Sequence, residues 1–369
     1  MRAGQVLVLL VIVAACYSIA VVEATSRDLK EFGEAESKYM DWIARMGAKH
    51  QAKAQVSGTF DASYAKSSGG VVTIVVDKNG GGNFKTISSA ISSIPQGAND
   101  RYVIHVKAGT YKEHVKIGSD LGPITLQGEG YDKTKITYGL TAGKAGSTLN
   151  SASVSVNSDN FIAKDIAFEN SSPDPGPGAV GKQAVALEIS GDKAAFYRCA
   201  FYGYQDTLYD RKGRHYFKDS LIVGYIDYIF GNGQSYYDSC TLQTVGQQNS
   251  GSLTAQKRKD SSEDTGYSFV NCRVEGKGYV YLGRAWGTSS RVVFIQTYFA
   301  NIIRPEAWYN WGVPAREKTV YYGEYKCFGP GANRAGRTPW SKALTDSQAQ
   351  PFLTVDWIDG KEWLPQGPQ

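Results

Sequence analysis

Acid and amide side chains recur along the middle of the chain at a nearly constant interval. Gln205 follows Gln183 by 22 residues, and Asp227 follows Asp206 by 21. In a fold that repeats with this period, two amides and two carboxylates would stack over three adjacent coils on one surface. Neighbouring carboxylates resist ionising together, so one can serve as an acid while the other attacks as a nucleophile. Amide N–H groups can stabilise an oxyanion. The spacing therefore predicts a site for acid–base or nucleophilic chemistry.

The same residues also allow a structural interpretation. Asparagine and glutamine ladders are common in β-solenoids, so Gln183 and Gln205 alone would not identify a site. A charged aspartate among aromatic and aliphatic neighbours, as at Asp227, is costly to bury without a partner. Arg284 could supply that partner in a purely structural ion pair. The chemical interpretation depends on several residue types occurring in register, not on any one of them.

A repeat of about 21 residues runs through this part of the chain. Four segments share an order of aromatic, polar, then Cys or Ser residues: Ala195–Phe201, His215–Ile222, Tyr236–Leu242 and Ser268–Val274. Their aligned positions are 21, 20 and 32 residues apart, at Cys199, Ser220, Cys240 and Cys272. This period, with one longer coil, is typical of a parallel β-helix, in which equivalent residues stack about 4.8 Å apart.

Short β-rich segments separated by Gly, Asn, Asp and Pro support this fold. They are Val71–Val76, Tyr102–Val106, Ile124–Gln127, Ala152–Val156, Phe161–Phe168 and Ala184–Ile189, with one helical stretch at Thr86–Ile94. The 41 glycines and 24 tyrosines among 369 residues favour turns and strands over a helical bundle. We therefore predict an all-β fold, a parallel β-helix, over residues 71–369.

The amino terminus has the pattern of a secretory signal. Arg2 precedes an apolar run from Val6 to Ala15, and Val22-Glu23-Ala24 offers small residues for cleavage. A membrane anchor is the competing interpretation, but the run is shorter than the ~20 residues that span a bilayer. We expect a signal peptide over residues 1–24 and a short amphipathic helix with a linker over residues 25–70. The mature protein would then be secreted.

Charge and cysteine content exclude several classes of function. A net charge of +5 without a basic run suits a polyanionic substrate and does not indicate nucleic-acid binding. Four dispersed histidines and the lack of an acidic cluster predict neither a metal site nor a cofactor. Cys199 and Cys240 would lie two coils apart, too far for a disulfide, and Cys240 and Cys272 would point the same way. We expect buried thiols instead of a disulfide framework.

Several ordered motifs run from Val71 to Leu364. They are Asp77…Gly80-Gly81-Gly82-Asn83-Phe84-Lys85-Thr86-Ile87, Gly109-Thr110-Tyr111-Lys112-Glu113, Gly203–Tyr209, Gly224–Gly231, Tyr281–Trp286 and Tyr321–Tyr325. In these motifs the chain resembles the plant pectin methylesterases, or pectinesterases, which act on cell-wall homogalacturonan. The resemblance implies a right-handed parallel β-helix, in agreement with the repeat found independently. It also implies a carboxylic ester hydrolase that converts pectin and water to pectate and methanol and so modifies the plant cell wall.

The resemblance further implies roles for residues at matching positions. Asp227 would be the nucleophile that forms an acyl-enzyme, and Asp206 would be the proton donor and later the base. Gln205 and Gln183 would supply the oxyanion site.

Three more positions are implied to bind substrate. Arg284 and Trp286 would contact the nucleophile and the sugar, and Thr148 matches a further substrate-contacting threonine. Ala285, between Arg284 and Trp286, departs from the proline that many members have there. Members without a pro-region also have alanine at this position, so only the rigidity of the loop is affected.

The resemblance has consequences for processing and partners. About 46 residues separate Ala24 from Val71, too few for the family's inhibitor-like pro-domain. Short members of this kind are often expressed in pollen, and some are allergens. We expect a monomer in the cell wall that binds pectin and the family's inhibitor proteins. Secretion would make the sequon Asn170-Ser171-Ser172 available for glycosylation.

Two other functions remain open at this point. A β-helical glycosidase such as a polygalacturonase also needs paired carboxylates, but it has less use for two amide donors. A wall-polysaccharide binding protein without activity is the second alternative, and the intact acids and amides argue against it.

Overall fold

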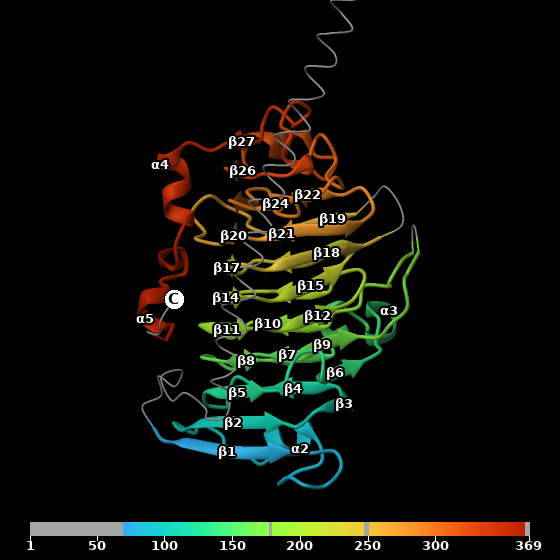
Figure 1. The fold of residues 1–369 in the computed structure, drawn as a ribbon, viewed down its shortest axis with the longest axis vertical. Coiled ribbons are helices and arrows are strands. Elements are labelled where there is room, and N and C mark those ends of the chain that lie inside the picture. Colours follow the sequence, from blue (N-terminus) through green and yellow to red (C-terminus); the bar gives the residue numbers. More distant parts are fainter. Residues whose placement is uncertain (1–68, 177–178, 247–250, 366–369) are drawn as a thin grey trace, which may run out of the picture. The chain divides into compact units, whose positions relative to one another are not determined.

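Most coils of the chain contribute one strand to each of three sheets, and equivalent strands of successive coils pair in parallel. The computed structural model describes residues 69–176, 179–246 and 251–365. The predicted signal peptide, and nearly all of the predicted helix and linker, lie outside these residues. Strands that follow one another in the order sheet 1, sheet 2, sheet 3 wind into a right-handed parallel β-helix (Figure 1). The predicted fold class is confirmed.

The three sheets differ in length but share this stacking. Sheet 1 contains β1 (Val71–Val76), β2 (Arg101–Val106), β5 (Ile124–Gln127), β8 (Ile162–Lys164), β11 (Ala194–Tyr197), β14 (Arg214–Lys218), β17 (Gln234–Asp238), β20 (Gly266–Val270), β23 (Arg291–Ile295), β26 (Tyr321–Tyr325) and β27 (Lys342–Ala343). Sheet 2 contains β3 (Gly109–Lys112), β6 (Thr134–Tyr138), β9 (Ala167–Asn170), β12 (Ala200–Tyr202), β15 (Leu221–Gly224), β18 (Thr241–Val245), β21 (Arg273–Lys277) and β24 (Tyr298–Phe299). Sheet 3 contains β4 (Val115–Ile117), β7 (Val154–Val156), β10 (Leu187–Ile189), β13 (Leu208–Asp210), β16 (Ile226–Gly231), β19 (Ser252–Gln256), β22 (Tyr281–Arg284) and β25 (Trp308–Tyr309).

The corner between sheets 1 and 2 is a tight turn that repeats on successive coils. Its first residue has a left-handed backbone, with φ between 48° and 55° at Asp165, Arg198, Asp219, Ser239, Asn271, Gln296 and Lys326. One such residue bends the chain sharply within two positions, so the chain can enter the next sheet at once. The predicted single strand Phe161–Phe168 is wrong for this reason, because Asp165 divides it into β8 and β9.

The interior is filled by stacked aromatic rings. Phe196, Phe217, Tyr237, Phe269 and Phe294 occupy equivalent positions on successive strands of sheet 1. Their ring centroids are 4.4–4.7 Å apart with nearly parallel planes. Stacked aromatic rings stabilise the contact between neighbouring coils beyond the contribution of the apolar surface that they bury.

The cysteine column matches the predicted repeat. The column consists of Cys199, Ser220, Cys240 and Cys272, and each of these residues immediately precedes a strand of sheet 2. The first residues of these strands pair with one another from coil to coil: Ala200, Leu221, Thr241 and Arg273. All four cysteines of the described residues, including Cys327, are free thiols. Cys240 Sγ lies 3.5 Å from the Phe217 carbonyl oxygen, and Cys272 Sγ lies 3.4 Å from that of Tyr237. The expectation of thiols without disulfides is confirmed for these positions.

In the described residues, one short helix packs against the first coils of the solenoid. The predicted helix at Thr86–Ile94 is observed as α2 (Ile87–Ser92), with the Thr86 side chain accepting from Ser89 N. Glu113, expected to be structural, accepts hydrogen bonds from Ile87 N and Ser88 N, both 2.9 Å, and so caps this helix.

The last segment packs along the outer face of sheet 1 (Figure 1). It contains α4 (Asp346–Ala349), η5 (Gln350–Phe352), η6 (Val355–Ile358) and α5 (Gly360–Trp363). Phe352, Ile358 and Leu364 join the apolar side chains of this sheet face. The remaining short elements lie between strands: α3 (Ala142–Ala145), η2 (Leu149–Ser151), η3 (Pro314–Lys318) and η4 (Pro330–Ala332). Within the described part of the chain, no helix is both long and apolar enough to cross a bilayer.

Candidate active site

The predicted acids and amides meet at the edge where the chain enters sheet 3. Gln205 pairs with Ile226, and Ala184 N donates to Gln205 O at 3.1 Å. Asp206 N donates to Ile226 O at 3.0 Å. This register places Gln183 beneath Gln205 in one column and Asp206 beneath Asp227 in the next. Adjacent coils lie about 4.8 Å apart, so the two carboxylates are close neighbours.

Both aspartates occupy an unusual backbone conformation. Their φ angles are 63° at Asp206 and 50° at Asp227, in the left-handed region that Asp and Asn tolerate better than most residues. The register between β16 and β19 also shifts here, since Ile226 pairs with Ser252 but Ile229 pairs with Thr254. Such a bulge changes the direction of a side chain and is frequent beside functional sites. The local backbone thus departs from regular strand geometry at the acids.

Asp227 is held in a two-pronged ion pair. Arg284, at the end of β22, donates from Nε to Asp227 Oδ1 at 2.6 Å and from Nη2 to Oδ2. The Trp311 ring covers the guanidinium, with its centroid 4.1 Å from Arg284 Cζ. A planar guanidinium matches both carboxylate oxygens and fixes their orientation. Asp227 is therefore oriented and compensated although it is only 5% exposed.

The electrostatic environments of the two acids differ. Burial raises the pKa of Asp206 well above its usual value, and the neighbouring Asp227 raises it further. Burial also raises the pKa of Asp227, but its hydrogen bonds with Arg284 oppose that rise. Within the described residues, no side-chain donor bonds to the Asp206 carboxyl. The pair is therefore poised to hold one proton on Asp206, with Asp227 ionised.

An aromatic cluster lies beside the acids. Tyr209 and Phe230 are paired residues of β13 and β16, and their rings stack at 4.3 Å. Trp286 packs against Phe230 with ring centroids 6.1 Å apart, and Trp311 joins the same cluster. Phe230 is buried, whereas Tyr209, Trp286 and Trp311 are half-buried, so part of each of these three residues remains open to a sugar ring. The sequence analysis identified Trp286 as a substrate-binding residue but did not identify Tyr209 or Trp311. The 21-residue step from Tyr209 to Phe230 is the signal that could have identified Tyr209.

The other predicted substrate residues lie along the same edge. Gln183 lies four residues before β10 and is half-buried. Thr148 is the N-cap residue of η2 before β7, also half-buried, and its carbonyl accepts from Ser151. β7 precedes β13 by two positions in sheet 3. The edge of sheet 3 thus runs from Thr148 past Gln183 and Gln205 to the aspartates.

Glycosylation at Asn170 does not fit the folded chain. The residue is 3% exposed in β9. Its Nδ2, the atom that a glycan would occupy, lies 2.9–3.0 Å from the carbonyl oxygens of Leu140, Ser151 and Val185. A glycan on this nitrogen would remove these bonds and force open the contact between coils. The buried position therefore argues against use of this sequon, whose three-residue pattern carries no information about burial.

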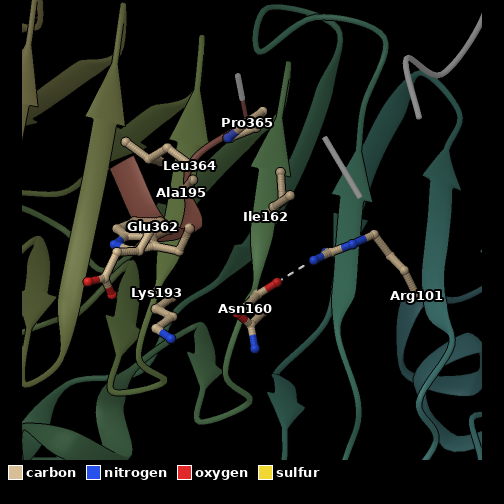
Figure 2. A pocket seen from close by; sticks show the side chains of 9 residues that line it. Arg101, Asn160, Ile162, Lys193, Ala195, Glu362, Leu364 and Pro365 are labelled. Carbon is tan, nitrogen blue, oxygen red and sulfur yellow. Dashed lines mark hydrogen bonds between the residues drawn. The ribbon is translucent and has the colours of Figure 1, made fainter. Parts of the chain in front are cut away.

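A pocket lies elsewhere on the molecule (Figure 2). It has a volume of about 190 Å³ and separates α5 from the outer face of sheet 1, with Arg101, Ile162, Lys193 and Leu364 in its wall. Arg101 Nη1 donates to Asn160 O at 3.0 Å across it. None of the predicted catalytic residues lines this pocket. In the described ranges, no three His, Cys, Asp or Glu side chains are grouped to hold a metal ion.

Known proteins share the sequence pattern and the fold of this chain. The profile of the Pectinesterase family matches residues 73–361. Putative pectinesterase 14 of Arabidopsis thaliana is 42% identical over 297 residues, which cover 80% of this chain and 89% of that protein. Among solved structures, pectin methylesterase from carrot matches with a TM-score of 0.75 at 34% identity, over 83% of this chain and 98% of that one. A pectin methylesterase in complex with a hexasaccharide matches with a TM-score of 0.69 at 27% identity, over 80% and 98%.

Proposed function

The chain belongs to the pectinesterase family, and we propose that it demethylates pectin with Asp227 as nucleophile and Asp206 as acid and base. The reaction converts pectin and water to pectate and methanol. The observation that carries the assignment of roles is the pair of stacked aspartates, of which only Asp227 is bonded to an arginine. This difference favours an ionised Asp227, as a nucleophile requires, and a protonated Asp206, as a proton donor requires.

The first half of the reaction forms an acyl-enzyme. An Asp227 carboxylate oxygen attacks the carbonyl carbon of the methyl ester and forms a tetrahedral oxyanion. Methoxide is a poor leaving group, so the proton on Asp206 passes to the ester oxygen as its bond to the carbonyl carbon breaks. Methanol leaves neutral, and the galacturonosyl carbonyl remains bound to Asp227 as an anhydride.

The second half of the reaction restores the enzyme. Asp206, now ionised, accepts a proton from a water molecule that attacks the anhydride carbonyl. The bond to Asp227 breaks and its electron pair regenerates the Asp227 carboxylate, while Asp206 holds one proton of the water again. The product leaves as galacturonic acid and loses the second proton of the water to solvent as it becomes a carboxylate. Arg284 stabilises the Asp227 carboxylate as it is regenerated, because its two donors already face both oxygens.

The two glutamines are positioned to donate to the oxyanion. They stack in the column beside the acids, and side-chain amides can act there without a helix terminus. Gln205→Ala is expected to lower the turnover number on the order of 100-fold, with little change in thermal unfolding. Gln234→Ala, at a half-exposed glutamine of sheet 1, is a matched control that should retain the wild-type rate. Equal rates for Gln205→Ala and the wild type would remove Gln205 from the mechanism.

Methanol release from highly methylated pectin tests the proposed activity against the alternatives. The esterase should release methanol stoichiometrically with new carboxylates and without new reducing ends. New reducing ends would indicate a glycosidase, which cleaves between sugars. Pectin binding without either product would indicate a protein that only binds the wall.

Several expectations concern the secretion, domain organisation, oligomeric state and partners of the protein. We propose that residues 1–24 direct secretion to the cell wall, that residues 25–70 precede a catalytic domain at 71–369, and that the mature chain is a monomer. The acidic polysaccharide it acts on suits its net positive charge. Binding by the family's inhibitor proteins and expression in pollen remain predictions from the resemblance; a shift in gel filtration with an inhibitor would test the former.

A further inference from the structure

The pocket between α5 and the outer face of sheet 1 has a buried cation in its wall (Figure 2). Arg101, the first residue of β2, lies on one side of the pocket, and Lys193 and Glu362 lie on the other. Arg101 is only 2% exposed, so its guanidinium is almost wholly removed from water. A buried cation is costly unless an anion or a full set of hydrogen-bond acceptors compensates it.

Only one corner of the Arg101 guanidinium is hydrogen-bonded. Its Nη1 donates to Asn160 O at 3.0 Å, to Thr125 Oγ1 at 3.2 Å and to Ile124 O at 3.4 Å. These acceptors belong to two neighbouring coils and hold the group in place. Nε is buried and has no partner, and the described residues offer no acceptor to Nη2. The edge formed by Nε and Nη2 is therefore unused.

That edge is the one through which other arginines of this chain bind carboxylates. Arg284 binds both oxygens of Asp227 through Nε and Nη2. Arg198 binds both oxygens of Asp165 through the same two atoms. Two parallel N–H bonds from one edge of a guanidinium match the two oxygens of a carboxylate. Arg101 thus has the donors that recognise a carboxylate, beside a pocket that can admit one.

The charges of the pocket also favour an anion. Across the ranges that the structure describes, neither Arg101 nor Lys193 forms an ion pair. Burial lowers the pKa of Arg101 to about 10, and no neighbouring charge opposes that effect. Glu362, the acid of the pocket wall, is exposed on α5. The two cations therefore leave the walls with an excess of positive charge.

The rest of the pocket is mostly apolar. Ile162 of β8 and Ala195 of β11 are buried on the outer face of sheet 1, and Leu364 follows α5. A volume of about 190 Å³ with apolar walls and a cation at one side suits a single ring or short chain with one acidic group. A sugar acid fits less well, because apolar walls leave its hydroxyl groups without hydrogen-bond partners.

We propose that this pocket binds a small monocarboxylate with an apolar body, whose carboxylate accepts hydrogen bonds from Arg101 and is attracted by Lys193. None of the predicted catalytic residues lines the pocket, so the inference does not depend on the proposed function. A bound ligand would contact both α5 and sheet 1. It should therefore stabilise the packing of the last segment on the sheet.

Phenylacetate is a probe for this site, because it joins one ring to one carboxylate. In titration calorimetry it should bind the wild-type protein at least about ten-fold more tightly than phenylacetamide, which lacks the charge, or acetate, which lacks the ring. It should also raise the unfolding temperature of the full chain, because a ligand of the folded state stabilises that state.

Substitutions in the wall test the roles of charge and space. Lys193→Gln should weaken phenylacetate binding about three- to five-fold. Arg101→Lys keeps the charge but not the planar edge, and it should weaken binding about ten-fold. Ala195→Leu fills the pocket and leaves both cations in place, so it should weaken binding at least about ten-fold. Lys277→Gln, at an exposed position of β21, is a matched control that should leave the affinity unchanged.

Two results would overturn the proposal. The first is that phenylacetate does not bind the wild type, or binds the wild type, Lys193→Gln and Ala195→Leu with equal affinity. The second is that unmethylated oligogalacturonate binds in place of phenylacetate and is weakened by Lys193→Gln, which would mean that the pocket holds a polysaccharide.

Discussion

Asp227→Asn is expected to lower the rate of methanol release at least about 10⁴-fold, because an amide cannot form the acyl-enzyme. The substitution keeps the shape of the side chain and its left-handed backbone, which Asn also tolerates. Residual activity would come only from binding and the oxyanion donors acting on water. Methanol release under saturating pectin measures the effect. A rate within about ten-fold of the wild type would exclude Asp227 as the nucleophile.

The same variant should lose stability. Arg284 would keep a partly buried positive charge without its carboxylate, at a cost of about 2 kcal/mol, given that its side chain is 26% exposed. Loss of activity could then be attributed to misfolding, so a matched variant is needed. Asp165→Asn breaks a similar pair, with Arg198 Nε and Nη2 each 2.7 Å from the carboxylate oxygens, at another left-handed residue.

The control separates stability from chemistry. Asp165 lies at the corner between sheets 1 and 2, away from the edge that carries the acids. Asp165→Asn should lower the unfolding temperature to a similar extent while retaining methanol release within about two-fold. A comparable loss of activity in both variants would mean that the Asp227 result reports destabilisation.

The sequence predicted the stacking of the site because the repeat itself encodes it. A period near 21 places Gln183 beneath Gln205 and Asp206 beneath Asp227, and the observed register does the same. The aromatic and cysteine columns follow from the same period. Periodicity could not reveal the bulge at Asp227, since the extra residue is a local exception to the repeat.

Contacts between distant coils were harder to predict. The Trp311 ring covers the Arg284 guanidinium. Trp311 lies two residues after the end of β25 and 27 residues after Arg284, in a segment that has no repeat motif. The burial of Asn170 depends on carbonyls from three separate segments, which a three-residue sequon cannot encode. The sequence pattern therefore predicts which residues stack on successive coils of the solenoid. Contacts between a loop and a strand that are far apart in the chain are visible only in the structure.

Asp206→Asn is expected to lower turnover about 10²- to 10⁴-fold, because the leaving methoxide loses its proton donor and the attacking water its base. It should nevertheless make the protein more stable at neutral pH. The Asp206 carboxyl is buried, and no side-chain donor bonds to it within the described residues. Its folded pKa is raised well above the unfolded value by burial and by Asp227. The folded chain therefore holds a proton that the unfolded chain releases.

The sign of the pH dependence follows from that difference. A raised folded pKa means that the contribution of Asp206 to stability is fully present below the unfolded pKa near 3.9 and is lost as pH rises towards the folded pKa. Asparagine has no such dependence, so the unfolding temperature of Asp206→Asn should exceed that of the wild type by more at pH 8 than at pH 5. Thermal unfolding at both pH values measures this difference. A variant that is less stable than the wild type at both would show that the Asp206 carboxyl is ionised and stabilised in the fold, and it could then not be the proton donor.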